Sequence, residues 1–70
     1  MHLYEAIEVE FTFGKYEGKK VDWVGDHDLK YLDWLKGQKW FTENKYGKLY
    51  TAVTVYLKDP RVNERLEDLI

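Results

Sequence analysis

Residues 6–24 read AIEVEFTFGKYEGKKVDWV, and this stretch decides the fold class that the sequence predicts. Apolar and polar side chains alternate from Ala6 to Phe13, which is the period-two pattern of a half-buried strand. An extended pattern resumes over Lys19–Val24, and the turn between the two carries Gly14 and Gly18, which can adopt positive φ. We therefore predict a β-hairpin here, with its apolar face covered, because an isolated hairpin is marginal in water.

A short helix is expected after the hairpin. Asp26 or Asp28 is suited to cap it, because a short carboxylate accepts hydrogen bonds from the unpaired amides of a first turn. Gly37 is a natural stop for this helix. The apolar positions at helical spacing between the cap and the stop are Leu29, Leu32 and Leu35.

Residues 40–57 carry two conflicting patterns. The β-branched run Val53–Tyr56 favours a strand by propensity. The apolar side chains of the segment also recur at helical steps, whereas a strand would leave neither of its faces polar. We predict a helix, and the strand stays an alternative for Val53–Tyr56.

A terminal helix is predicted over residues 59–70, with Asp59 as its N-cap and Pro60 at its first helical position. Its apolar face consists of Val62, Leu66, Leu69 and Ile70. The expected architecture is one small α+β domain over residues 1–70, with a flexible N-terminus at residues 1–5. Its N-terminal β-hairpin packs on two to three short helices in the order β-β-α-α-α. The aromatic residues expected in the core are Trp23, Trp34, Trp40, Phe41 and Tyr50.

The composition argues against an enzyme. The chain of 70 residues has no Cys and no Ser, so it lacks the two commonest catalytic nucleophiles. The triplet Asp26-His27-Asp28 has no second ligand group at a spacing that suits zinc, so helix capping explains it better. We therefore expect no catalytic residue, no metal and no cofactor.

Charge and hydropathy restrict the compartment. A net charge of −2 gives no overall attraction to nucleic acid or to an anionic membrane. No apolar run approaches the ~18 residues of a membrane span, and residues 1–5 lack the features of a secretory signal. A chain without Cys fits a reducing compartment, so we expect a cytoplasmic protein that is a monomer or a weak homodimer.

Positive charge is concentrated in two short segments. Residues 14–20 hold three Lys and one Glu, and residues 36–48 hold four Lys and one Glu, which together give +5. If the fold brings both segments to one face, lysines can contact phosphates while Tyr16 stacks on a base. Otherwise the glycines and lysines serve an ordinary turn and the two lysine sets lie apart. The candidate binding residues are Lys15, Tyr16, Lys19, Lys20, Lys39 and Lys45, with Gly14 and Gly18 shaping the loop.

Three motifs resemble a known family: FGKYEGKKV at residues 13–21, DLKYLDWL at 28–35 and QKWF at 38–41. Together they resemble the small domain at the C-terminus of exodeoxyribonuclease X-like proteins, and stand-alone bacterial and phage proteins described as quorum-sensing-regulated virulence factors. The resemblance covers about residues 11–57 and implies an accessory domain beside nucleic-acid enzymes, without the catalytic exonuclease portion. The residues that match its loop motif are Gly14, Lys15, Gly18 and Lys19, and those that match its packing motif are Tyr31, Trp34, Leu35, Trp40 and Phe41.

The sequence therefore predicts a non-catalytic accessory module that binds nucleic acid, either single-stranded or without sequence specificity. The alternative is a protein–protein adaptor or inhibitor, of bacterial or phage origin, that uses its terminal helix or an exposed aromatic residue. A third hypothesis is a small-nucleotide binder at the Gly-Lys loop, although this loop lacks the G-x-x-x-x-G-K-[ST] pattern of phosphate-binding loops.

Overall fold

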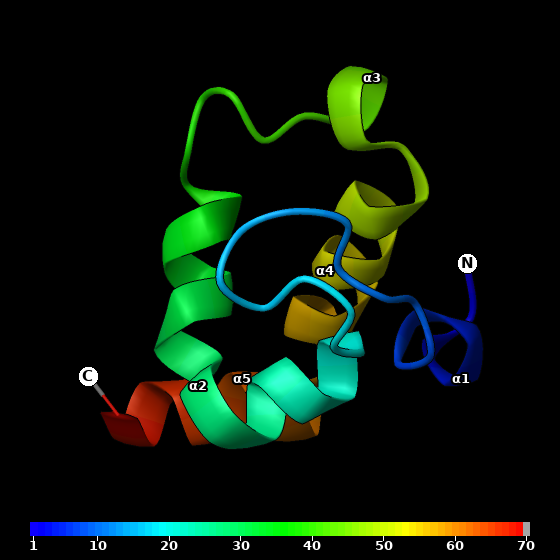
Figure 1. Cartoon of the computed structure of the whole chain (residues 1–70). Coiled ribbons are helices and arrows are strands. Elements are labelled where there is room, and N and C mark those ends of the chain that lie inside the picture. The colour runs from blue at the N-terminus through cyan, green and yellow to red at the C-terminus, as the bar shows by residue number, and fades with distance from the viewer. Residues whose placement is uncertain (70) are drawn as a thin grey trace.

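The computed structural model describes residues 1–69, which form helices connected by loops (Figure 1). The helices are α1 (Leu3–Ala6), α2 (Val21–Lys36), α3 (Glu43–Tyr46), α4 (Lys48–Lys58) and α5 (Pro60–Leu69). They account for 65% of residues 1–69, and pairing between extended segments of these residues is limited to one antiparallel bridge between Glu10 and Lys20. The predicted α+β class, with its N-terminal β-hairpin and its β-β-α-α-α order, is therefore wrong, and the fold is helical.

The second predicted strand, Lys19–Val24, mostly belongs to the start of α2. Val21, Val24 and Gly25 are all buried, and their spacing of three and one residues is that of a helix face. The apparent alternation of Val21 and Trp23 is too short to distinguish a strand from the first turn of a helix.

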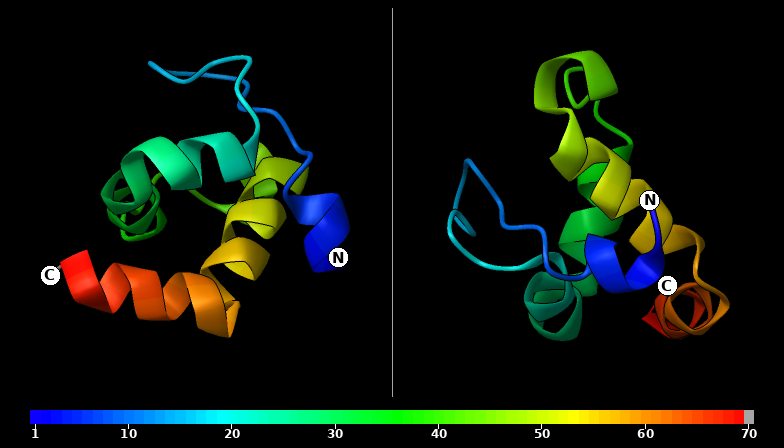
Figure 2. Two further views of the ribbon diagram at one scale, coloured as in Figure 1. Left: turned by 90° about the horizontal axis from the view of Figure 1, so that it is seen from below. Right: turned by 90° about the vertical axis from the view of Figure 1, so that its right-hand side faces the viewer.

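The first predicted strand, Ala6–Phe13, is also wrong. Ala6 ends α1, residues 7 and 8 form a turn, and the rest has almost no strand partner. Residues 7–20 form a loop that crosses in front of α4 and beside α2 in Figure 1, and Figure 2 shows this loop and α5 on opposite sides of α2. The amide of Phe11 donates to the carbonyl of Lys19, and the amide of Val21 donates to the carbonyl of Val9, both at 2.9 Å. The pairing ends there because the backbone turns into α2 at Val21. Alternation in the sequence thus produces an extended, half-buried segment without a sheet.

Helix α2 changes direction at Asp28, whose φ of −156° and ψ of 66° are not helical. Asp28 Oδ1 accepts a hydrogen bond from the amide of Tyr31 at 3.3 Å, which is the interaction of an N-cap. The predicted capping by Asp28 is confirmed, although it caps the second half of a longer helix. Gly37 ends α2 as predicted. This is the longest helix, with 16 residues, and no helix within residues 1–69 has the length and hydropathy that a membrane span requires.

The helix predicted over residues 40–57 is confirmed in part, by α3 and α4. It is interrupted at Gly47, whose φ is +53°, and residues 40–42 are not helical. The strand alternative for Val53–Tyr56 is wrong. The helical face of α4 that carries Ala52, Val53 and Tyr56 is buried, so the apolar spacing outweighs the β propensity of its branched side chains.

The start of the terminal helix is also confirmed. Asp59 Oδ1 accepts hydrogen bonds from the amides of Arg61 and Val62 at 3.0 and 3.4 Å. Pro60 is the first residue of α5, which extends to Leu69. Ile70, predicted on its apolar face, lies outside the described residues.

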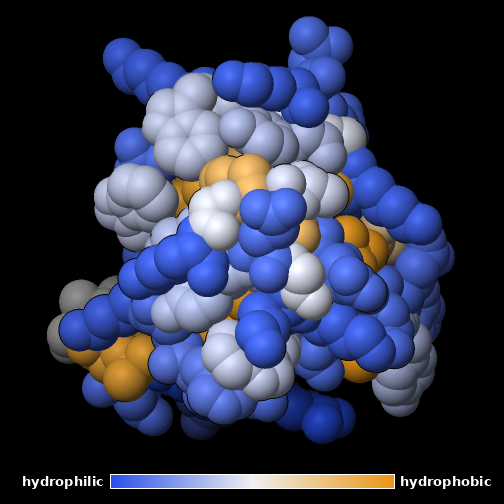
Figure 3. Space-filling model, viewed as in Figure 1, coloured by the Kyte–Doolittle hydropathy of each residue, from blue (hydrophilic) through white to orange (hydrophobic). Residues whose placement is uncertain are grey.

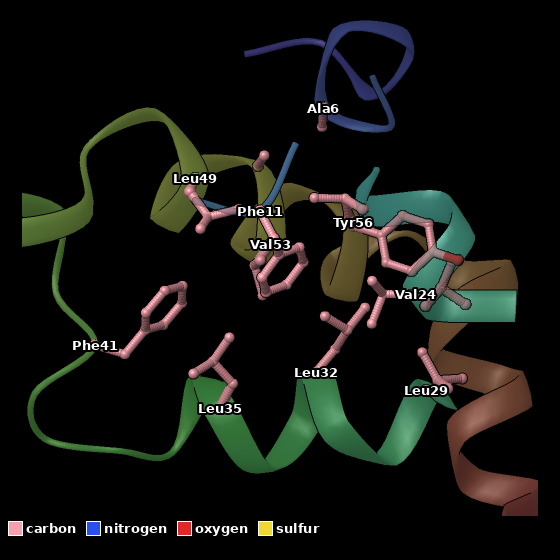
Figure 4. Close-up of a cluster of buried hydrophobic side chains, with 13 residues drawn as sticks. Ala6, Phe11, Val24, Leu29, Leu32, Leu35, Phe41, Leu49, Val53 and Tyr56 are labelled. Atoms are coloured by element: carbon pink, nitrogen blue, oxygen red, sulfur yellow. The ribbon is translucent and has the colours of Figure 1, made fainter. Parts of the chain in front are cut away.

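The core lies between α2, α4 and the loop segment around Phe11, with Ala6 of α1 closing one end (Figure 4). Phe41 is buried as predicted, whereas the prediction that Trp34 and Trp40 are core residues is wrong, because they are 53% and 40% exposed. Leu32 and Leu35 occupy the inward positions of α2, which leaves Trp34 on the outer side of the helix. Trp23 and Tyr50 are half-buried at the edge of the core.

Candidate nucleic-acid interface

Six aromatic rings form a continuous row, with centroid distances of 5.0–6.2 Å between successive members. In order along the row they are Trp23, Tyr16, Tyr31, Trp34, Trp40 and Tyr46, and we call them the aromatic row. The rings come from the loop 7–20, both halves of α2, the loop before α3 and α3 itself. Figure 3 shows pale surfaces, a colour that Trp and Tyr share with Gly and Thr, among blue hydrophilic side chains. The row therefore joins segments that are distant in the sequence.

The tip of the loop 7–20 packs against the second half of α2 and against α3. The ring of Phe13 lies 5.9 Å from that of Trp40 and 4.7 Å from that of Tyr46. Gly14 has a φ of +75°, and a β-carbon there would lie 3.3 Å from the hydroxyl of Tyr31, so the close approach favours glycine. Gly18 also has a positive φ, as predicted for this loop. These contacts bring the lysine segment 14–20 next to the segment 36–48.

Asp28 anchors the loop to α2. The hydroxyl of Tyr16 donates a hydrogen bond of 2.7 Å to Asp28 Oδ2, and Lys15 Nζ lies 3.6 Å from the same oxygen. The hydrogen bond raises the pKa of Tyr16 and lowers the pKa of Asp28. Tyr16, predicted as a stacking ring, thus has its hydroxyl committed to a structural contact.

Replacing Asp28 with Asn should lower the free energy of unfolding at pH 7 and make this free energy fall less as the pH is lowered. Because the pKa of Asp28 is lowered by folding, its carboxylate stabilises the fold fully above about pH 5, and this stabilisation is lost as the pH falls through the lowered pKa. We expect a loss of about 1 kcal/mol at pH 7, since Asn still caps a helix and solvent screens the ion pair. Urea unfolding at pH 7 and at about pH 3 measures the difference, with the exposed Asp33→Asn as control. Equal losses at both pH values would contradict a role for the charge.

The candidate lysines differ in how far their charge is already paired. Lys20 Nζ lies 2.9 Å from Glu8 Oε1, a hydrogen bond that raises the pKa of the lysine, and Lys15 is paired with Asp28. The candidates that form no salt bridge with any of residues 1–69 are Lys19, Lys39 and Lys45. These three carry the charge best suited to an external anion.

Two of the unpaired lysines lie at opposite ends of the aromatic row. Lys19 Nζ lies 4.9 Å from the ring centre of Trp23, and Lys45 Nζ lies 5.6 Å from that of Tyr46. Lys39 is exposed and precedes Trp40 in the chain. We call these three lysines together with the aromatic row the basic aromatic face.

Trp34 and Trp40 are members of the row that the sequence did not identify as surface residues, because both were predicted to lie in the core. Their ring centres are 6.2 Å apart and their planes are inclined by 66°, an edge-to-face contact. The signal that could have identified Trp34 is the spacing of Leu32 and Leu35, which fixes the inward side of α2. For Trp40, in a loop, no periodic signal exists.

The three residues of the Asp26-His27-Asp28 triplet all have protein partners. Asp26 Oδ1 lies 3.4 Å from a guanidinium nitrogen of Arg65. His27 Nδ1 is 2.8 Å from the carbonyl of Trp23, and its ring stacks on that indole at 3.9 Å. Together with the helix cap formed by Asp28, these contacts give each of the three side chains a structural role.

No protein-family model, no curated protein and no solved structure matches the chain. The resemblance of three motifs to the C-terminal domain of exodeoxyribonuclease X-like proteins therefore stays a prediction. What distinguishes the basic aromatic face is its geometry, in which two exposed indoles lie within a row of rings that has an unpaired lysine at each end.

Proposed function

We propose that this protein is a non-catalytic module that binds nucleic acid through the basic aromatic face. The observation that carries the proposal is the position of Lys19 and Lys45 at the two ends of the aromatic row. Ammonium groups at the two ends of such a row can contact separate phosphates of one strand. Phosphate contacts carry no sequence information, and neither lysine segment contains Arg, the residue best suited to recognise guanine. The lysine contacts should therefore not distinguish one base sequence from another.

Other features of the chain support a binding role without catalysis. The common nucleophiles Ser and Cys do not occur in it. Its acidic residues outnumber its basic ones, so a polyanion is attracted to a local face rather than to the whole surface. We propose that the protein is cytoplasmic, because a Cys-free chain suits a reducing compartment. We further propose that it is a monomer or a weak homodimer.

Binding is tested by fluorescence anisotropy with a labelled oligonucleotide, titrated with the protein at several salt concentrations. At ~50 mM salt, where phosphate contacts are strong, we expect saturable binding whose affinity falls steeply as salt is added. Absence of binding to single-stranded and duplex probes at this salt concentration would refute the proposed function.

The contribution of the lysines is tested by a triple variant. Lys19→Ala, Lys39→Ala and Lys45→Ala together should weaken binding about tenfold or more and make the logarithmic salt dependence shallower by about 2. A control triple variant removes the same charge elsewhere, at Lys30, Lys58 and Arg61, which are exposed in α2, α4 and α5 and form no salt bridge within residues 1–69. Equal losses in the two triple variants would show that net charge, rather than this face, controls binding.

A further inference from the structure

Trp34 and Trp40 are the aromatic side chains of the row with the most accessible rings, at 53% and 40% exposure. Each of the other four rings has a lysine ammonium over it: Lys19 over Trp23, Lys15 over Tyr16 and Tyr31, and Lys45 over Tyr46, at 4.9–5.6 Å. Within residues 1–69, no lysine or arginine lies over either exposed indole. The two indoles are therefore exposed to solvent and have no cation over their rings.

We infer that the nucleic acid bound by this face is single-stranded, and that Trp34 and Trp40 stack on its unpaired bases. The inference rests on the proposed function and names its substrate class. In a duplex, both faces of an internal base are covered by neighbouring base pairs, so an exposed indole finds no partner there. In a single strand each base has a free face, and stacking on an aromatic side chain contributes about 1–3 kcal/mol per base.

The indoles are held in place by their neighbours. The ring of Trp40 makes an edge contact with Phe13 at 5.9 Å and with Tyr46 at 6.1 Å, and Trp34 lies 5.7 Å from Tyr31. Fixed rings lose little conformational freedom when a base stacks on them, which strengthens binding.

The angle between the indoles determines which strands fit best. Because their planes are inclined by 66°, two bases stacked on Trp34 and Trp40 cannot remain stacked on each other. The strand must therefore break its own base stacking at this point. Pyrimidine strands stack weakly and are flexible, so this break costs them less than it costs a purine strand. The face should prefer oligo-dT to oligo-dA.

The test compares labelled oligo-dT, oligo-dA and their duplex by anisotropy at ~50 mM salt. We expect oligo-dT to bind tightest and the duplex weakest. Trp34→Ala and Trp40→Ala should each weaken binding of oligo-dT by about tenfold, whereas Trp→Phe at either position should retain most of it. Tyr4→Ala is the matched control, since Tyr4 is 76% exposed on α1 outside the row, and it should bind as the parent does.

A fluorescence measurement on the unaltered protein gives a second readout that does not depend on the variants folding. Stacking of bases on Trp34 and Trp40 should quench the tryptophan emission in parallel with the anisotropy of oligo-dT. The inference is overturned if the duplex binds as tightly as oligo-dT, or if the Trp→Ala variants bind normally. In both cases the proposed function survives if the lysine triple variant still loses affinity. If no probe binds at all, the proposed function itself fails.

Discussion

A Gly25→Ala variant should unfold at a temperature about 5–15 °C below that of the parent protein. Gly25 is buried in α2, and a β-carbon there would lie 2.5 Å from ring atoms Cε2 and Cζ of Tyr56. Tyr56 is only 4% exposed, so its ring cannot move aside without opening the core. Overpacking of this kind costs about 1–3 kcal/mol and occasionally more. That exceeds the ~1 kcal/mol by which Ala normally improves a helix.

Gly37→Ala is the matched control. Gly37 ends α2 with φ of −83°, and the nearest atoms to a β-carbon there are backbone oxygens at 3.5 and 3.9 Å. This change should alter the free energy of unfolding by less than about 1 kcal/mol, in the stabilising direction if at all. A double variant, Gly25→Ala with Tyr56→Leu, should lose less stability than the sum of its single changes, because the clash is removed. Equal midpoints for the two glycine variants in thermal unfolding would contradict the steric explanation.

The contact between Gly25 and Tyr56 is a feature that the local sequence does not predict. In the sequence Gly25 stands between the predicted strand Lys19–Val24 and the predicted helix caps at Asp26 or Asp28, whereas the structure places it inside α2, where Tyr56 of another helix requires the space. The features that were predicted correctly are local: the caps at Asp28 and Asp59, the stop at Gly37 and the helical spacing in α4. Each depends on residues within about one turn, so the sequence alone contains the information.

The predicted hairpin failed because strand pairing is a tertiary property. The alternation of residues 7–13 predicts their inward and outward sides, and Phe11 is buried between exposed neighbours as that pattern requires. Whether the segment becomes a strand depends on a partner, and residues 21–24 fold into α2 instead. Burial of Val21 and Val24 in the helical core outweighs the few ladder hydrogen bonds that a hairpin would gain.

The candidate interface was accessible to sequence analysis only in part. Counting charges identifies the segments 14–20 and 36–48, and the fold places them next to each other through Phe13. Charge counts do not show that Lys15 pairs with Asp28 or that Lys20 pairs with Glu8, because the acidic partners lie 13 and 12 residues away in the chain. Nor does composition separate a buried aromatic ring from an exposed one.

The neighbours Trp40 and Phe41 allow an experiment to distinguish an exposed aromatic ring from a buried one. Phe41 is 2% exposed and its ring contacts those of Phe13, Tyr46 and Tyr50 at 5.2–6.3 Å. Phe41→Ala should therefore lower the free energy of unfolding by about 3–5 kcal/mol, a large share of the ~4–10 kcal/mol available to a domain of this size. Trp40 is larger but 40% exposed, so Trp40→Ala should cost only about 1 kcal/mol.

Urea unfolding of the two alanine variants, followed by circular dichroism, measures both losses. If the free energies of unfolding fall equally, Trp40 is a core residue and the basic aromatic face loses one of its two exposed indoles. Binding of oligo-dT should respond in the opposite order, because Trp40→Ala removes a stacking surface from a folded protein. Only folded protein binds, so the apparent affinity falls in proportion to the folded fraction. Phe41→Ala should therefore weaken binding only as far as it unfolds the protein. If Phe41→Ala mainly lowers stability and Trp40→Ala mainly lowers affinity, Phe41 stabilises the fold and Trp40 contacts the ligand.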